Sequence, residues 1–115
     1  ISQPVVSTSN RIDIDIARGQ SFTHTTTESV NDFRVINPPS GGTFAFTLKI
    51  VQGTTPKGVG IDTFVNSIGN AVNVFWPGGI VPVITPSGGA ADIYSFMSFD
   101  GGSTLYGGVV GQNFT

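Results

Sequence analysis

The only histidine in the chain, His24, lies in a threonine-rich run and is the first side chain to test for acid–base chemistry. A Ser–His–Asp site would combine His24 with a serine and with Asp13 or Asp32. However, the sequence has no Gly-x-Ser-x-Gly turn of the kind that presents a nucleophilic serine. We therefore expect His24 to be an exposed strand residue, and we expect no catalytic residues and no enzymatic activity.

Two carboxylates, Asp13 and Asp15, are spaced two residues apart, which places them on one face of a strand, roughly 6.5–7 Å apart. Such a pair would suit a Ca²⁺ ion or the two sides of a glycosidic bond. Here the acids alternate with isoleucines, which should take the buried face, so the carboxylates should point to solvent. Arg11 and Arg18 are close enough in sequence to screen them. A solvated polar face is the favoured interpretation.

The remaining chemistry-bearing residues also have structural explanations. Asp100 precedes two glycines, as a turn-forming aspartate does, and Asp92 would begin a strand in a similar way. The chain has no cysteine and no calcium-loop motif, and its glycine pairs do not follow a phosphate-binding pattern. We expect no metal and no cofactor.

Some residues would instead serve as contacts with a partner or a ligand. Exposed aromatic side chains would stack on sugar rings, although most aromatics in so small a domain should belong to the core. Glycines in a late strand would let a neighbouring backbone approach closely. The apolar pair near the N-terminus would lie along a partner by strand addition. The candidate interface or ligand contacts are therefore Trp76, Tyr106, Gly107, Gly108, Gly111, Val5 and Val6.

The elements that would position these residues are strands, because apolar residues recur with a period of two and no window indicates an amphipathic helix. An Asp-Gly-Gly turn between two alternating runs predicts a hairpin near the C-terminus. Residues 61–68 remain open between a short strand and a helical turn, and Pro82 would place residues 80–84 at a sheet edge. The other expected strands are residues 11–17, 21–27, 30–36, 43–51, 70–76, 92–99 and 103–114.

About eight strands with short turns predict an all-β fold, an antiparallel β-sandwich that is jelly-roll-like. We expect residues 11–115 to form this single domain and residues 1–10 to form an extended arm. Alternatively, the first residues would form a frayed terminus.

Composition excludes several classes of function. Only 10% of the residues are charged, where roughly 25% is typical, and the net charge is −2. The chain has no excess of positively charged side chains to neutralise phosphates, so nucleic acid is not expected as a partner. No uninterrupted apolar stretch approaches the ~18 residues of a membrane-spanning helix, so membrane insertion is not expected.

The C-terminal third resembles a pattern in structural proteins of tailed bacteriophages, found in tail-fibre-like, receptor-binding and virion-surface proteins. The match spans Trp76 to Phe114, about a third of the chain, and Leu105 departs from it where a second aromatic is usual. The matching residues are Trp76, Pro77, Gly78, Gly79, Asp92, Phe96, Phe99, Asp100, Gly101, Gly102, Tyr106, Gly107, Gly111, Gln112 and Phe114.

The resemblance implies a non-enzymatic protein of the virion surface, either a capsid decoration protein or a module of a tail fibre or spike. We expect contacts with other virion proteins and a homo-oligomer, with a trimer favoured. The alternative is a carbohydrate-binding module that recognises a host-surface glycan.

Overall fold

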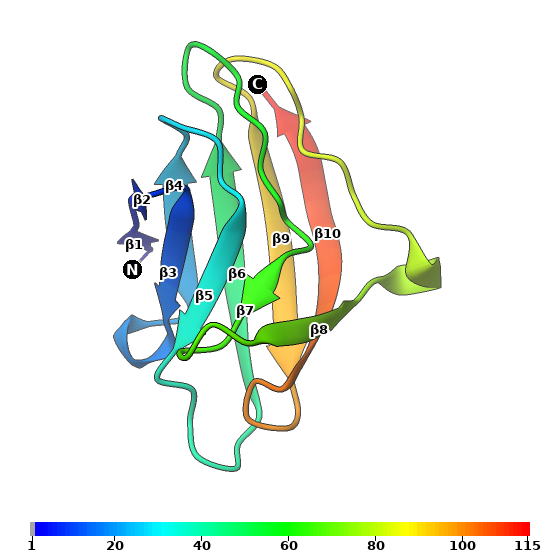
Figure 1. The fold of residues 1–115 in the computed structure, drawn as a ribbon. Coiled ribbons are helices and arrows are strands. Elements are labelled where there is room, and N and C mark those ends of the chain that lie inside the picture. Colours follow the sequence, from blue (N-terminus) through cyan, green and yellow to red (C-terminus); the bar gives the residue numbers. More distant parts are fainter. Residues whose placement is uncertain (1) are drawn as a thin grey trace.

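The computed structural model describes residues 2–115, and over these residues the fold is all-β (Figure 1). Two 3-10 helices, η1 (Ile16–Arg18) and η2 (Pro77–Gly79), interrupt ten strands. The strands are β1 (Gln3–Pro4), β2 (Ser7–Thr8), β3 (Arg11–Asp15), β4 (Ser21–Thr25), β5 (Asp32–Ile36), β6 (Phe44–Val51), β7 (Phe64–Val65), β8 (Ala71–Phe75), β9 (Ala91–Ser98) and β10 (Thr104–Phe114).

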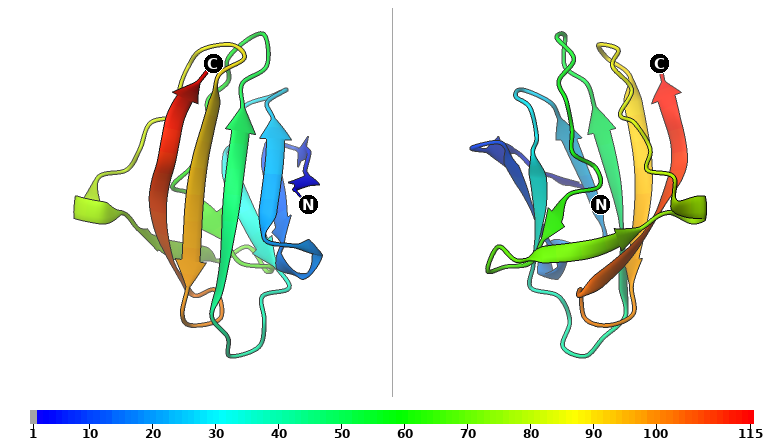
Figure 2. Two further views of the ribbon diagram at one scale, coloured as in Figure 1. Left: turned by 180° about the vertical axis from the view of Figure 1, so that it is seen from behind. Right: turned by 45° about the vertical axis from the view of Figure 1, so that its right-hand side comes forward.

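All ten strands belong to one sheet, which curls so that its two halves face each other (Figure 2). The strand order is β1-β4-β6-β9-β10-β8-β7-β5-β3-β2. Strands β6, β9 and β10 pair antiparallel, whereas β4–β6, β10–β8, β7–β5 and β5–β3 pair parallel. The sheet is therefore mixed and has ten strands, which corrects the expected antiparallel arrangement and the expected eight strands. Period-two alternation identifies a strand but carries no information about its partner or their relative direction.

Most of the expected strands are present with ends shifted by one or two residues, and three local expectations are resolved. Residues 61–68 contain the short strand β7, and residues 80–84 form no strand. The predicted hairpin is confirmed, because β9 and β10 pair antiparallel across Asp100 and two glycines. Gly101 and Gly102 both have positive φ, and the Asp100 carboxylate accepts a bond from the backbone N–H of Thr104 at 2.9 Å.

The core lies between the two halves of the curled sheet and is rich in phenylalanine. Phe64 on β7 packs against Phe96 on β9, with ring centroids 4.9 Å apart, and Phe46 on β6 stacks on Phe96 at 5.1 Å. The buried isoleucines Ile12 and Ile14 confirm the inward face expected for β3. Because a buried side chain of this size contributes roughly 1.5–3 kcal/mol, these contacts hold the two halves together.

The N-terminal segment runs between the two edges of the sheet and pairs with both. Strand β1 lies parallel to β4, and β2 lies antiparallel to β3. Between them, the N–H of Val5 donates to the carbonyl of Thr23 at 2.9 Å. The structure thus places residues 3–8 against their own chain, in the positions where an open sheet would present unpaired strand edges.

His24 lies inside the fold, which corrects the expectation of an exposed side chain. Only 2% of its surface is exposed, because it shares the inward face of β4 with Phe22. Its Nδ1 lies 2.9 Å from the carbonyl oxygen of Val5, and its Nε2 has no hydrogen-bond partner among the described residues. His24 therefore contacts the N-terminal segment and does not face solvent.

Candidate functional site

Exposed aromatic side chains gather on the outer side of β8, β9 and β10. We call Phe75, Met97, Phe99 and Tyr106 the aromatic face. Tyr106 lies directly opposite both Phe75 on β8 and Met97 on β9, and 52% of its surface is exposed. Its ring centroid is 5.8 Å from that of Phe75 and 6.0 Å from that of Phe99. Large apolar groups in contact with one another but open to water mark a surface for interaction.

A hollow of about 480 Å³ adjoins the aromatic face where β8 and β10 diverge. It is lined by Phe75, Trp76, Pro77, Tyr106 and Gly107, so the structure brings together three of the predicted contacts. Trp76 is only 7% exposed, and its indole N–H donates to Asp62 at 2.6 Å. Tyr106 and Phe75 therefore supply the accessible ring surface, and Trp76 supplies one wall.

The three predicted glycines have different surroundings. A Cβ on Gly107 would lie 2.7 Å from the ring of Trp76, and a Cβ on Gly111 would overlap the ring of Phe114. Both glycines thus make room for aromatic rings of their own chain. Gly108 is open, with Ser95 Oγ as its nearest neighbour at 4.0 Å.

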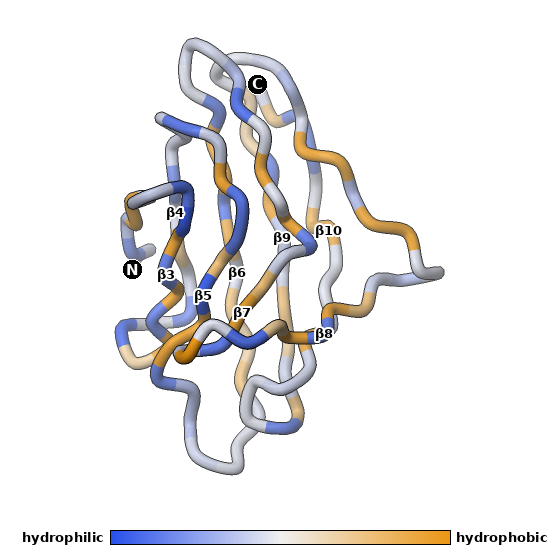
Figure 3. Tube along the Cα trace, in the orientation of Figure 1, coloured by the Kyte–Doolittle hydropathy of each residue, from blue (hydrophilic) through white to orange (hydrophobic). Residues whose placement is uncertain are grey.

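Strand β10 is paired on both sides only over its first part. Residues 104–106 pair with β8, and from residue 107 onward β10 is paired with β9 alone. The irregular segment 80–84, which follows η2, is apolar (Figure 3). Ile80 and Val83 in this segment are largely exposed. Gln112 on β10 donates to the carbonyl of Val83 at 2.7 Å. An open strand edge and an exposed apolar segment therefore lie along the later part of β10.

A buried carboxylate anchors this region. Asp92, 1% exposed, accepts hydrogen bonds from the backbone N–H and hydroxyl of Thr85, the hydroxyl of Tyr94, the amide of Gln112 and the backbone N–H of Asn113, at 2.7–3.1 Å. Burial raises the pKa of Asp92, but the hydrogen bonds from Thr85, Asn113 and Tyr94 together outweigh it and hold the pKa below its ordinary value. The same burial, together with the bond to Asp92, raises the pKa of Tyr94.

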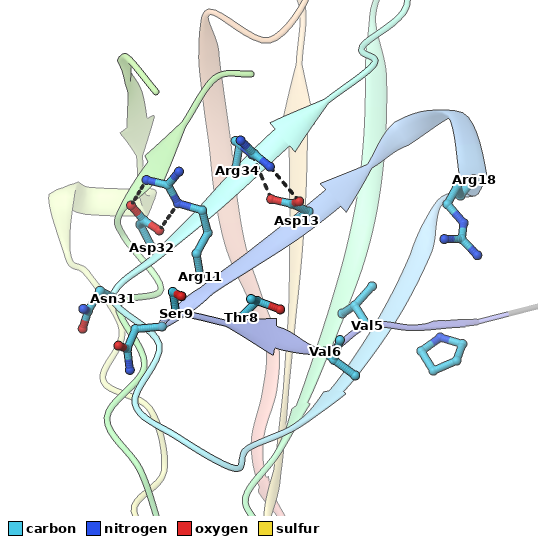
Figure 4. A pocket seen from close by; sticks show the side chains of 12 residues that line it. Val5, Val6, Thr8, Ser9, Arg11, Asp13, Arg18, Asn31, Asp32 and Arg34 are labelled. Atoms are coloured by element: carbon cyan, nitrogen blue, oxygen red, sulfur yellow. Dashed lines mark hydrogen bonds and ion pairs between the residues drawn. The ribbon is translucent and has the colours of Figure 1, made fainter. Parts of the chain in front are cut away.

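A second hollow, of about 780 Å³, lies on the outer side of β3 and β5 (Figure 4). We call it the arginine hollow; residues 4–6, 8–11, 13, 18, 31, 32 and 34 line it. Predicted contacts Val5 and Val6 form part of its wall, so they lie apart from the aromatic face.

Two bidentate ion pairs cross the arginine hollow. Nε and Nη2 of Arg11 donate to the carboxylate of Asp32 at 2.8 and 2.9 Å, and the same atoms of Arg34 donate to Asp13 at 2.9 and 2.8 Å. The hydrogen bonds from Arg11 hold the pKa of Asp32 below its ordinary value despite some desolvation. Arg18, at the end of η1, faces the same hollow.

Sequence reasoning missed this pairing, although a signal for it is present. It placed Arg11 and Arg18 near Asp13, whereas the parallel register sets Arg11 opposite Asp32 and Asp13 opposite Arg34. The two strands carry opposite charges in opposite order, Arg-x-Asp on β3 and Asp-x-Arg on β5. This opposite order of charges indicates ion pairs only if β3 and β5 are assumed to pair parallel and in register.

Within residues 2–115, no group of three or more His, Asp or Glu side chains is arranged to hold a metal ion. Over the same residues, no helix is long and apolar enough to cross a membrane. Comparison with models of known protein families, with curated proteins and with solved structures finds no match to this chain.

Proposed function

We propose that this protein is a non-enzymatic structural component of a bacteriophage particle surface, a capsid decoration protein or a tail-fibre module, which assembles with copies of itself. The observation that carries the proposal is the aromatic face, where Phe75, Phe99 and Tyr106 are each more than half exposed. Tyrosine and phenylalanine are enriched at protein–protein interfaces.

A second copy of the same chain is the partner that this surface fits best. Residues 58–115 contain three aspartates and no lysine or arginine, so the surface offers no cation to pair with an acidic partner. Since an aromatic side chain presents 150–250 Å², the three half-exposed rings give roughly 300 Å². Ile80 and Val83 are further exposed apolar side chains, in the segment that follows η2. A stable interface buries ~800 Å² on each partner, so such additional apolar surface would be needed.

The particle-surface part of the proposal is supported by the sequence pattern from Trp76 to Phe114. The matching residues lie at and just before η2, on β9, in the turn that follows β9, and on β10. Several of them, Trp76, Pro77, Tyr106 and Gly107, line the hollow beside the aromatic face. The proposal also includes a jelly-roll-like sandwich as the finer description of the fold. Its support is the packing of Phe64 on β7 against Phe46 and Phe96 on the facing strands.

Molar mass by size exclusion with light scattering, at two protein concentrations, tests the self-association. We expect a stable oligomer, a trimer by preference, and we expect the double change Phe75→Ser and Tyr106→Ser to give a monomer with unchanged circular dichroism. Ile68→Ser removes an even more exposed apolar side chain, in the turn before β8, and should leave the oligomer intact. A wild-type monomer at both concentrations would overturn the proposal, as would an oligomer that survives the double change.

A second candidate function, binding of a host-surface glycan, is favoured by the arginine hollow. Its lining combines carboxylates, guanidiniums and amides with the apolar side chains of Val5 and Val6. Protein sites for small polar ligands have this mixture of a few converging polar groups and an apolar wall, in hollows of about 300–1,000 Å³.

A further inference from the structure

The charged groups of the arginine hollow have a small positive excess. Three arginines, Arg11, Arg18 and Arg34, line it together with two aspartates, Asp13 and Asp32, so the charges of the lining residues sum to +1. A ligand with a single negative charge would balance that excess. A phosphate dianion would exceed it and would be repelled by the two carboxylates.

The ion pairs hold two guanidiniums in place without using all of their donors. Arg11 and Arg34 each bind their aspartate through Nε and Nη2, so the Nη1 protons lie outside the pair. About a third of each arginine side chain is exposed, 37% for Arg11 and 34% for Arg34. Because each planar fork is already fixed by its aspartate, little side-chain entropy is lost when it receives a further acceptor.

Arg18 differs from the other two arginines. It is the last residue of η1, its side chain is exposed, and no ion pair involves it among the described residues. Its whole guanidinium is thus able to receive a carboxylate in a bidentate manner, the geometry that arginine favours. The two paired arginines would then supply the surrounding positive field.

The remaining lining suits the neutral part of a sugar ring. Asp13, with 44% of its side chain exposed, has the surface to accept hydrogen bonds from ring hydroxyls, and Thr8, Ser9 and Asn31 add neutral polar groups. Val6, 78% exposed, offers an apolar surface for the C–H face of the ring.

We propose that the arginine hollow binds an acidic sugar, a uronic acid, with its carboxylate on Arg18 and its hydroxyls toward Asp13 and the neutral polar wall. This inference rests on the second candidate function, glycan binding, and names its ligand class. It does not depend on self-association through the aromatic face.

Calorimetric titration with methyl glucuronide and with methyl glucoside of the same anomer tests the proposal, because the two sugars differ only at C6, which is a carboxylate in the first and a hydroxymethyl group in the second. For the wild-type protein, we expect the glucuronide to bind with a Kd in about the millimolar range and the glucoside at least tenfold more weakly. Arg18→Gln should weaken glucuronide binding at least tenfold and leave the circular dichroism unchanged, since Arg18 is exposed.

Lys49→Gln is the matched control, because it also removes one exposed positive charge, on the outer side of β6 and away from the hollow. It should leave the glucuronide affinity within twofold. Equal binding of both sugars would overturn the uronic acid proposal and support the broader glycan function. Absence of binding for both would overturn the two together, and an unchanged affinity in Arg18→Gln would overturn the assignment to this hollow.

Discussion

At Gly107, the backbone of β10 passes directly beneath the ring of Trp76. That ring is confined on its other sides by edge contacts with Phe96 and Tyr94, whose centroids lie 5.6 and 6.4 Å away, and by the bond to Asp62. Glycine is therefore required at this position by space and not by an unusual backbone angle. The same residue shapes the hollow beside the aromatic face.

We expect Gly107→Ala to destabilise the fold by about 1–3 kcal/mol, the usual cost of overpacking a confined site. The added Cβ would lie 2.7 Å from the Trp76 ring, which its neighbours hold in place. Urea unfolding followed by the fluorescence of Trp76, the only tryptophan, measures the change directly.

Gly108→Ala is the matched control, because its Cβ would meet no atom closer than 4.0 Å. It should change stability by less than about 0.5 kcal/mol, as surface substitutions usually do. If the two alanine variants were equally stable, the contact with Trp76 would not explain the glycine.

At the scale of the elements, Asp92 joins three of them. Its carboxylate ties the segment that follows η2, through Thr85, to β9 and to the end of β10, through Gln112 and Asn113. The irregular residues 80–84, which the sequence assigned to an edge strand, are thus held beside β10 by side-chain bonds. Five donors converge on one buried anion, with no cation among them.

We expect Asp92→Asn to lower the free energy of unfolding by about 3 kcal/mol at neutral pH. An asparagine amide replaces one acceptor oxygen with a donor, which leaves N–H and O–H groups unpaired in a buried site. Asp62→Asn is the control: Asp62 accepts one bond, from Trp76, and an amide oxygen can retain it. Urea unfolding of both variants gives the comparison.

The comparison of the wild type with Asp92→Asn should also depend on pH. The pKa of Asp92 is lower in the folded chain than in the unfolded chain, so its contribution is full above the unfolded value of about 4 and is lost as pH falls through the folded value. The stability difference between wild type and Asp92→Asn should therefore shrink below about pH 4. A difference that stays constant down to pH 2 would contradict this assignment.

Across the whole molecule, the positive charges are segregated. All five lysines and arginines lie within residues 1–57, and the arginine hollow is on β3 and β5, whereas the aromatic face is on β8, β9 and β10. The two candidate surfaces are thus on separate parts of the curled sheet, one polar and charged and the other apolar. Different forces would drive binding at each.

We expect the salt concentration to affect binding at the two surfaces differently. Raising NaCl from about 50 to about 500 mM should weaken glucuronide binding several-fold, because screening acts on partly exposed charges. Self-association through the aromatic face should change by less than about twofold, since apolar burial supplies its free energy. Titration calorimetry and light scattering at both salt concentrations provide the measurement, and parallel weakening of both processes would contradict the separation.

The amino-acid sequence by itself determined the local features of this protein. The alternation of isoleucines with charged residues predicted the buried face of β3, and Asp100 with its two glycines predicted the hairpin, because turn chemistry and a period of two act between near neighbours. The low content of charge and the absence of cysteine are likewise properties of the chain alone.

Only the tertiary structure decided which strands meet. The parallel pairing of β3 with β5 brings Arg34 to Asp13, and the inward face of β4 buries His24, because long-range packing of the sheet selects partners that alternation leaves open. The close approach of Trp76 to Gly107 has the same origin. Contacts between residues tens of positions apart depend on how the whole sheet curls, and a local pattern does not specify that curl.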